Sequence, residues 1–159
     1  MALNKGKKFE ARVKADFEKI LDDITVDRIY DTQNGLKNIS NVCDFIVYKY
    51  PNIFYLEVKS HKGNTFPLQC LTQYPKLIKK HGKKGVRAGV ILWMIDHDVV
   101  LYIPVSTFYK LYKDDKKSFN IKMIGDVRYK SFVIPTKKLR TFLECDFTVL
   151  LNRDDKEIQ

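Results

Sequence analysis

Residues 88–95 form a nearly unbroken apolar run, AGVILWMI, which constrains the fold more than any other feature of the chain. A strand that is apolar on both faces has to be covered on both faces, so the run predicts a central, buried strand of a sheet. No run of about 18 apolar residues occurs, so we expect no membrane-spanning segment. The 159 residues suffice for one domain with one core, and we predict a single domain over residues 1–159.

Hydrophobic periodicity places further elements around this strand. Phe9, Val13, Phe17 and Ile20/Leu21 recur at helical spacing, which predicts a helix over about residues 5–22. Composition and turn residues predict the remaining elements: strands at 24–31, 42–48, 53–60, 99–103 and near 129–134, and helices at 66–80 and 105–113. The type of the last element, near 139–151, stays open. This order predicts an α/β or α+β fold with one central mixed β-sheet flanked by helices.

The charge balance narrows the class of partner. Lys and Arg number 29 against 19 Asp and Glu, which gives a net charge of +10. This surplus favours a polyanionic partner, with nucleic acid ahead of an anionic membrane surface; the alternative is a generally basic, soluble surface. Cys43, Cys70 and Cys145 are too far apart for a CxxC zinc pair, and their number does not fit a disulfide framework. The first residues lack the apolar segment of a secretion signal, so we expect a cytoplasmic protein.

Two adjacent predicted strands bring acidic residues together. A four-residue loop at 49–52 pairs Tyr48 with Ile53, and this register places Asp44 directly opposite Glu57. Because side chains alternate along a strand, Asp44, Glu57 and Lys59 share one face. The intervening residues of the second strand are expected to point into the core: Phe54, Leu56 and Val58.

Two carboxylates in this position need compensation. Opposed side chains have Cβ atoms about 5 Å apart, and like charges at that separation are destabilising unless they share a proton or a cation. Ligands that are all oxygen suit Mg²⁺ or Mn²⁺ better than zinc. Lys59 would neutralise a bound phosphate or orient an attacking water, and the metal would activate that water. The alternative is an exposed salt bridge between Lys59 and one carboxylate, and the residues alone favour both about equally.

The Asp/Glu-x-Lys spacing is weak evidence by itself. It also occurs at residues 114–116, 115–117 and 154–156, all in polar stretches where we expect solvated surface. Only Glu57-Val58-Lys59 lies inside a strand-like apolar segment with an acid on the preceding strand. The chemical hypothesis therefore concerns this trio alone.

The combined pattern resembles the PD-(D/E)xK nuclease superfamily. NKGKKFE at residues 4–10, Cys43-Asp44-Phe45, Glu57-Val58-Lys59 and TFPLQ at residues 65–69 together resemble RecU-type Holliday junction resolvases of Gram-positive bacteria and their phages. The similarity spans roughly residues 4–113. It implies a restriction-endonuclease-like fold and a homodimeric, Mg²⁺-dependent endonuclease that resolves four-way DNA junctions by paired nicks, in recombination and repair. Such a protein would act in the cytoplasm of a bacterium or of a phage-infected host.

The resemblance also implies a role for each member of the pattern. Asp44 and Glu57 would bind Mg²⁺, for which Mn²⁺ could substitute, with help from the Val58 backbone carbonyl. Glu10 would complete the acidic site directly or through a metal-bound water. Lys59 would be the catalytic lysine, and Gln69 would position the water or the scissile phosphate. Lysines around these residues would form a rim that binds the DNA backbone: Lys5, Lys7, Lys8, Lys37, Lys62, Lys79, Lys80, Lys83 and Lys84.

One departure from the RecU pattern leaves the assignment open. RecU-type proteins carry a longer basic stalk between the first two strands, whereas here this interval is only about residues 32–41, with Lys37 as its single charge. Archaeal-type junction resolvases share the Gly-x-x-Phe-Glu opening and lack a stalk, so they are a close rival assignment. Two more functions fit the same residues: a nuclease of the same fold that acts on flaps or forks, and a module that binds branched DNA without cutting it.

Overall fold

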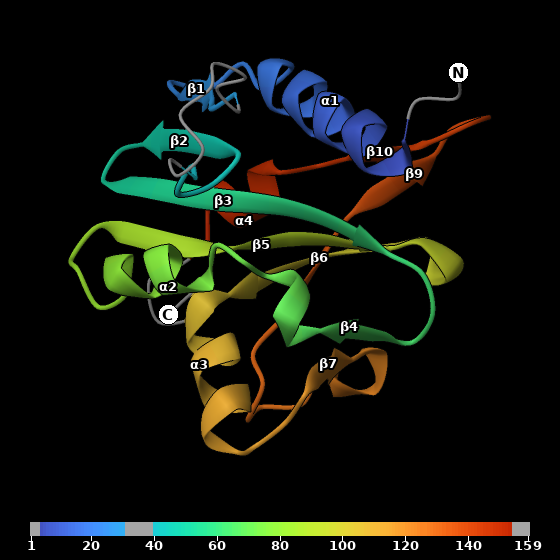
Figure 1. The fold of residues 1–159 in the computed structure, drawn as a ribbon. Coiled ribbons are helices and arrows are strands. Elements are labelled where there is room, and N and C mark those ends of the chain that lie inside the picture. Colours follow the sequence, from blue (N-terminus) through green and yellow to red (C-terminus); the bar gives the residue numbers. More distant parts are fainter. Residues whose placement is uncertain (1–3, 31–39, 154–159) are drawn as a thin grey trace.

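The computed structural model describes residues 4–30 and 40–153. Its centre is a six-stranded sheet in the order β1-β2-β3-β5-β6-β8 (Figure 1). Only β3 and β5 pair in parallel, so the sheet is mixed. The strands are β1 (Thr25–Arg28), β2 (Phe45–Lys49), β3 (Asn52–His61), β5 (Val86–Met94), β6 (Val99–Pro104) and β8 (Phe132–Ile134). The predicted α/β arrangement around a central mixed sheet is confirmed.

The apolar run occupies β5, between β3 and β6, and every residue of β5 after Val86 is buried. One face of the sheet packs against α1 (Lys5–Glu18), whose Phe9, Val13 and Phe17 lie in that core. The other face is covered by α2 (Tyr74–Leu77) and α3 (Val105–Lys113), as Figure 1 shows. Both faces of β5 are therefore covered, as the run predicts.

Smaller elements extend the two layers. The ribbon of β4 (Thr65–Pro67) and β7 (Ser118–Asn120) lies on the α3 side, and the ribbon of β9 (Thr136–Lys138) and β10 (Leu143–Cys145) lies on the α1 side with α4 (Thr148–Leu151). Four single turns of 3-10 helix complete the description: η1 (Leu68–Cys70), η2 (Ile78–Lys80), η3 (Ile95–His97) and η4 (Ile121–Met123). No helix among the described residues is long and apolar enough to cross a bilayer.

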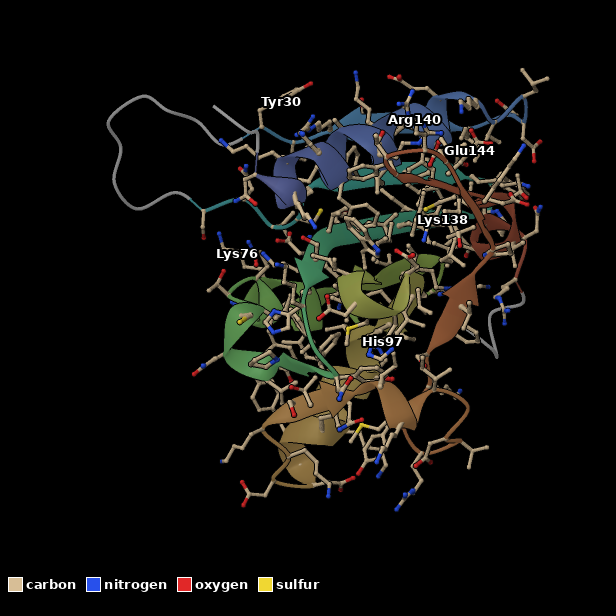
Figure 2. The ribbon with its side chains drawn as sticks, turned by 90° about the vertical axis from the view of Figure 1, so that its right-hand side faces the viewer. Tyr30, Lys76, His97, Lys138, Arg140 and Glu144 are labelled. Carbon is tan, nitrogen blue, oxygen red and sulfur yellow. The ribbon has the colours of Figure 1, made fainter. Side chains whose placement is uncertain are left out.

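A network of charges anchors α1 to the β9–β10 ribbon. The Glu144 carboxylate accepts from Arg12 at 2.8 Å and from Lys19 at 2.7 Å, and Figure 2 shows Glu144 beside the helix. Asp16 is buried and accepts the Cys145 backbone N–H at 2.8 Å. These contacts fix the position of α1, which carries Glu10.

Two predicted helices differ from the structure. The helix at 5–22 ends at Glu18, where the chain turns as the Ile20 N–H bonds to the Phe17 carbonyl, and Leu21 is fully exposed. The helix predicted at 66–80 is wrong. Phe66 lies in β4 opposite Phe119, and the separate short helix α2 begins at Tyr74, with Pro75 in its first turn. A long-range strand pairing overrides the local pattern there.

The structure corrects the predicted length of the hairpin loop and shows the type of the last element. The β2–β3 hairpin loop has two residues instead of four, because Lys49 pairs with Asn52 around Tyr50 and Pro51, which are joined by a cis peptide bond. The register is unchanged, since both loop lengths pair Tyr48 with Ile53. The open element at 139–151 contains a strand, β10, followed by the helix α4.

Candidate active site

The β2–β3 hairpin has the predicted register, and its ladder stops at Phe45, which pairs with Leu56. Beyond that point the Asp44 backbone N–H donates to the Leu56 carbonyl at 3.1 Å, and its side-chain Oδ2 accepts the Val58 N–H at 2.7 Å. On the other side, the Ile29 N–H donates to the Asp44 carbonyl at 2.7 Å. Asp44 is thus fixed where the two strands part, with its carboxylate directed at β3.

Glu57 is a buried acid in the middle of the sheet. Its side chain is only 2% exposed, one oxygen lies 2.8 Å from Lys59 Nζ, and Oε2 is buried with no hydrogen-bond partner. Burial raises the pKa of Glu57 to about 7, and the Asp44 charge acts in the same direction against the opposing effect of Lys59. The structure therefore brings Asp44, Glu57 and Lys59 into one electrostatic group.

The two faces of β3 lie in different surroundings. Phe54, Leu56 and Val58 lie in the core beneath α1, as predicted. Glu57 lies on the opposite face, where Tyr55 packs at the margin of the α2–α3 core. The Lys80 ammonium lies 4.8 Å from the centre of the Tyr55 ring, so a predicted DNA-binding lysine reaches this face of the sheet.

Glu10 lies close enough for its charge to raise the pKa of Glu57 slightly, but its carboxylate is engaged elsewhere. Glu10 Oε2 lies 2.9 Å from Arg28 Nη2, and the Arg28 guanidinium covers the Tyr30 ring at 4.9 Å. Over residues 4–30 and 40–153, no three His, Cys, Asp or Glu side chains converge closely enough to hold a metal ion. Glu10 does not join Asp44 and Glu57 as a third converging carboxylate in this arrangement.

Arg28 lies beside the candidate site, and the sequence alone did not reveal this position. It ends β1 and pairs with Phe45, next to Asp44, so strand pairing brings it to the site from a segment without a motif. Only the pairing of β1 with β2, which no local pattern reveals, could have identified it.

The residues present fit a hard divalent cation. Asp44 and Glu57 supply carboxylate oxygens, and one Glu57 oxygen is buried without a partner. In a strand, the N–H and C=O of one residue point toward the same neighbouring strand, and the Val58 N–H points at Asp44. The Val58 carbonyl therefore points to the same side of β3 as Asp44, beyond the last pair of the β2–β3 ladder. Together with the two carboxylates it completes a set of oxygen ligands of the kind that Mg²⁺ prefers.

Gln69 lies in η1, which follows β4. It is exposed in η1 and lines a hollow together with Tyr112, Lys116 and Lys117. No hydrogen bond described for residues 4–30 and 40–153 joins Gln69 to Asp44, Glu57 or Lys59.

The predicted lysine rim is divided between the two ends of β3. Lys5, Lys7 and Lys8 lie on the first turns of α1, where a Cβ at Gly6 would lie 3.7 Å from Ser60 Oγ. Lys62 lies just beyond the end of β3, and Lys79 lies in η2. Lys83 and Lys84 precede β5, near the level of Ile53, and Lys59 lies six residues or roughly 20 Å further along β3. Lys37 lies outside the described residues.

The comparisons with known proteins find likeness in structure and none in sequence. No family model matches the sequence, and no curated protein matches it. Among solved structures, the chain is similar to Hjc, a Holliday junction resolvase from the archaeal hyperthermophile Archaeoglobus fulgidus. The sequence identity is 19% and the TM-score is 0.48, over 64% of this chain and 78% of that one. The function proposed below therefore depends on the geometry of Asp44, Glu57 and Lys59.

Proposed function

We propose that this chain is a divalent-metal-dependent endonuclease that cuts branched DNA, with the four-way junction as its preferred substrate. The observation that carries the proposal is the state of Glu57, which is buried with one oxygen on Lys59, the other unpaired, and the Asp44 charge close by. A buried carboxylate oxygen without a partner, beside a second acid, is costly in a purely structural ion pair and is compensated when a cation binds there.

Asp44, Glu57 and the Val58 carbonyl would hold Mg²⁺ or Mn²⁺. When bound, the ion supplies water activation and stabilises the charge on the phosphate and the leaving 3′-oxygen. Lys59 keeps Glu57 oriented through its 2.8 Å contact and presents a positive charge where the phosphate would lie. Arg28 holds Glu10 at the margin of the site, where Glu10 would act through water.

The substrate assignment has its own support. The net charge of +10 and the lysines on α1 and η2 suit a DNA backbone. The TFPLQ segment supports the RecU-type assignment within the PD-(D/E)xK nucleases, and the short interval at 32–41 supports the archaeal-type rival. Paired nicks require two sites, so we propose a homodimer that acts in the cytoplasm of a bacterium or of an infected host.

A cleavage assay on synthetic DNAs tests the proposal. Four-way junction, flap and linear duplex are incubated with Mg²⁺, Mn²⁺ or chelator, and products are mapped on each strand. We expect symmetric nicks in the junction with either metal. Asp44→Asn should abolish them and leave binding intact, whereas Asp27→Asn, at an exposed acid of β1, should cut normally.

Each remaining outcome favours a different function. Preferential cutting of the flap supports a nuclease of similar fold with another target. Tight binding of the junction without cutting in any metal supports a non-cleaving module and contradicts the proposal.

A further inference from the structure

A hollow of about 540 Å³ lies between η1 and the turn that follows α3. Its walls include Pro67 and Gln69 on one side and Tyr112, Lys116 and Lys117 on the other. They are held together by backbone pairing, because β4 pairs with β7 and the Leu68 N–H donates to the Lys117 carbonyl at 3.0 Å. The hollow is therefore built into the fold, between two elements that are distant in sequence.

The Tyr112 ring lines this hollow, and two further tyrosines lie near it on α3 and α2. Tyr112 is 44% exposed and Tyr109 is 45% exposed. The Tyr74 ring supports Tyr112 at a centroid distance of 4.7 Å, and the Lys113 ammonium lies 5.3 Å from the Tyr109 ring. Exposed aromatic rings next to lysines are the surface on which proteins stack single-stranded bases.

The charge around the hollow is positive. The segment KLYKDDKK at residues 110–117 holds four lysines and two aspartates. Asp114 accepts from the Tyr129 hydroxyl at 2.9 Å and lies 3.6 Å from Lys110, and Asp115 lies 3.2 Å from Lys117 at a very exposed position. Exposed ion pairs of this kind are weak, so Lys110 and Lys117 stay available to bind phosphates.

The hollow lies on the same side of the sheet as Glu57. Phe66 and Leu68 of its β4–η1 wall belong to the core cluster that also contains Cys43 and Val90, the neighbours of Asp44 and Glu57. The chain runs from Lys59 through the end of β3 directly into β4 and η1, as Figure 1 shows. DNA held at the acidic group can therefore extend over this surface.

We propose that this hollow binds an unpaired nucleotide next to the branch point of the DNA. The Tyr112 ring stacks on the base, the Gln69 side-chain amide bonds to the base edge, and Lys116 and Lys117 bind the flanking phosphates. The base must be unpaired, because in an intact duplex its faces are covered by neighbouring bases. The inference rests on the proposed function and makes Gln69 a substrate-binding residue instead of a catalytic one.

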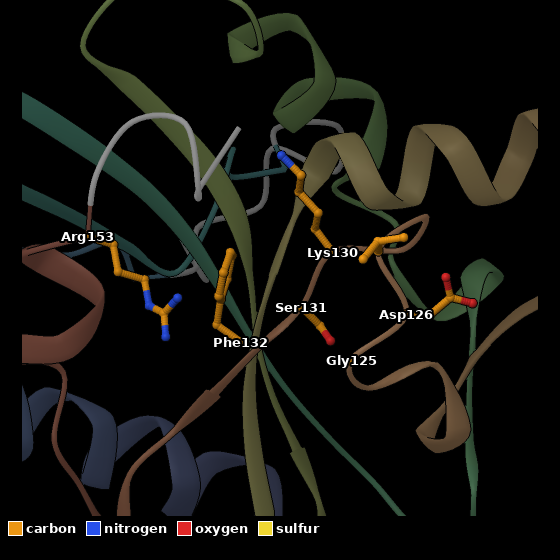
Figure 3. Close-up of a pocket in the computed structure, with 7 residues that line it drawn as sticks. Gly125, Asp126, Lys130, Ser131, Phe132 and Arg153 are labelled. Carbon is orange, nitrogen blue, oxygen red and sulfur yellow. The ribbon is translucent and has the colours of Figure 1, made fainter.

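A second pocket is less suited to stacking a base. It lies between the segment at 125–132 and the end of α4, where Lys130, Phe132 and Arg153 line a hollow of about 340 Å³ (Figure 3). The Arg153 guanidinium already covers the Phe132 ring at 4.2 Å. The exposed Tyr112 ring makes the first hollow the better stacking site.

The test compares two junctions that differ only in two unpaired thymidines at the branch point. Binding is measured by fluorescence anisotropy in chelator, so that no cleavage occurs. Tyr112→Leu should weaken binding of the junction with unpaired thymidines about tenfold and that of the fully paired junction less than about twofold. Tyr48→Leu is the matched control, since Tyr48 is 43% exposed on β2, and it should change neither affinity.

Two more variants separate stacking from folding. Tyr112→Phe keeps the ring and loses only the hydroxyl, so it should bind both junctions like the wild type. Gln69→Ala should weaken binding only where the unpaired thymidines are present. An equal loss on both junctions in Tyr112→Leu, or no loss on either, overturns the inference.

The two proposals fail in distinguishable ways. Absence of nicking by the wild type in Mg²⁺ and Mn²⁺ contradicts the proposed nuclease, whatever the anisotropy shows. Normal nicking of the paired junction by both wild type and Tyr112→Leu, with no selective loss of binding, contradicts the nucleotide site alone.

Discussion

Asp44 Oδ2 accepts the Val58 backbone N–H at 2.7 Å, at the point where β2 and β3 stop pairing. This bond replaces a rung of the ladder with a side chain and directs a carboxylate at the strand that carries Glu57. The hairpin thereby builds an acidic pair from two residues that are adjacent only through strand register. The pH dependence of stability and the affinity for metal should both depend on this pair.

Glu57→Gln should change the pH dependence of stability in metal-free protein. The folded-state pKa of Glu57 is raised to about 7, above its ordinary value near 4.5, so this group stabilises the fold below pH 4.5 and that contribution is lost as pH rises to 7. The loss is roughly 3 kcal/mol. Urea denaturation in chelator should show wild-type stability falling against that of Glu57→Gln between these pH values. A constant difference would contradict the raised pKa.

Divalent metal should raise the melting temperature of the wild type. A cation that binds only the folded state stabilises it by mass action, and at 100 times its Kd the gain is about 2.7 kcal/mol. Asp44→Asn should lose most of this gain, because it removes one of the two acids of the site. Asp27→Asn should keep it. An equal shift in both variants would place the bound metal elsewhere.

Arg28→Gln should lower junction nicking with little effect on stability. The Arg28–Glu10 pair is partly exposed, so its loss should change the free energy of unfolding by less than about 1 kcal/mol. Without Arg28, Glu10 loses its orientation at the margin of the site, and we expect single-turnover nicking to fall at least about tenfold. Lys14→Gln, which breaks the exposed Lys14–Glu18 pair of the same helix, is the control and should nick normally. Unchanged nicking in Arg28→Gln would show that the pair is only structural.

Asp16→Ala should destabilise the fold strongly. Asp16 is buried, lies 2.6 Å from Arg12 and accepts the Cys145 backbone N–H, so its removal leaves that buried N–H without an acceptor and takes one of two carboxylates from Arg12. Removing one partner of such a buried ion pair lowers the free energy of unfolding by about 3 kcal/mol or more. Glu18→Ala, at an exposed position of α1, should cost less than about 1 kcal/mol. Chemical denaturation compares the two, and equal losses would contradict the anchoring role of Asp16.

The sequence predicted what local patterns determine. The apolar run specifies β5 because both faces of that strand are buried, and the hairpin register follows from alternation around Tyr50 and Pro51. It did not predict β4, because the pairing of Phe66 with Phe119 joins segments 53 residues apart. The contact between Glu10 and Arg28 was missed for the same reason, since it depends on how α1 packs against β1.

The most direct test of the metal site is a crystal structure of the protein soaked in Mn²⁺, with the anomalous signal used to locate the ion. We expect one ion bound by the carboxylates of Asp44 and Glu57 and by the Val58 carbonyl, at metal–oxygen distances of roughly 2.2 Å. An anomalous map without a peak between Asp44 and Glu57, at a Mn²⁺ concentration that supports nicking, would contradict the proposed site.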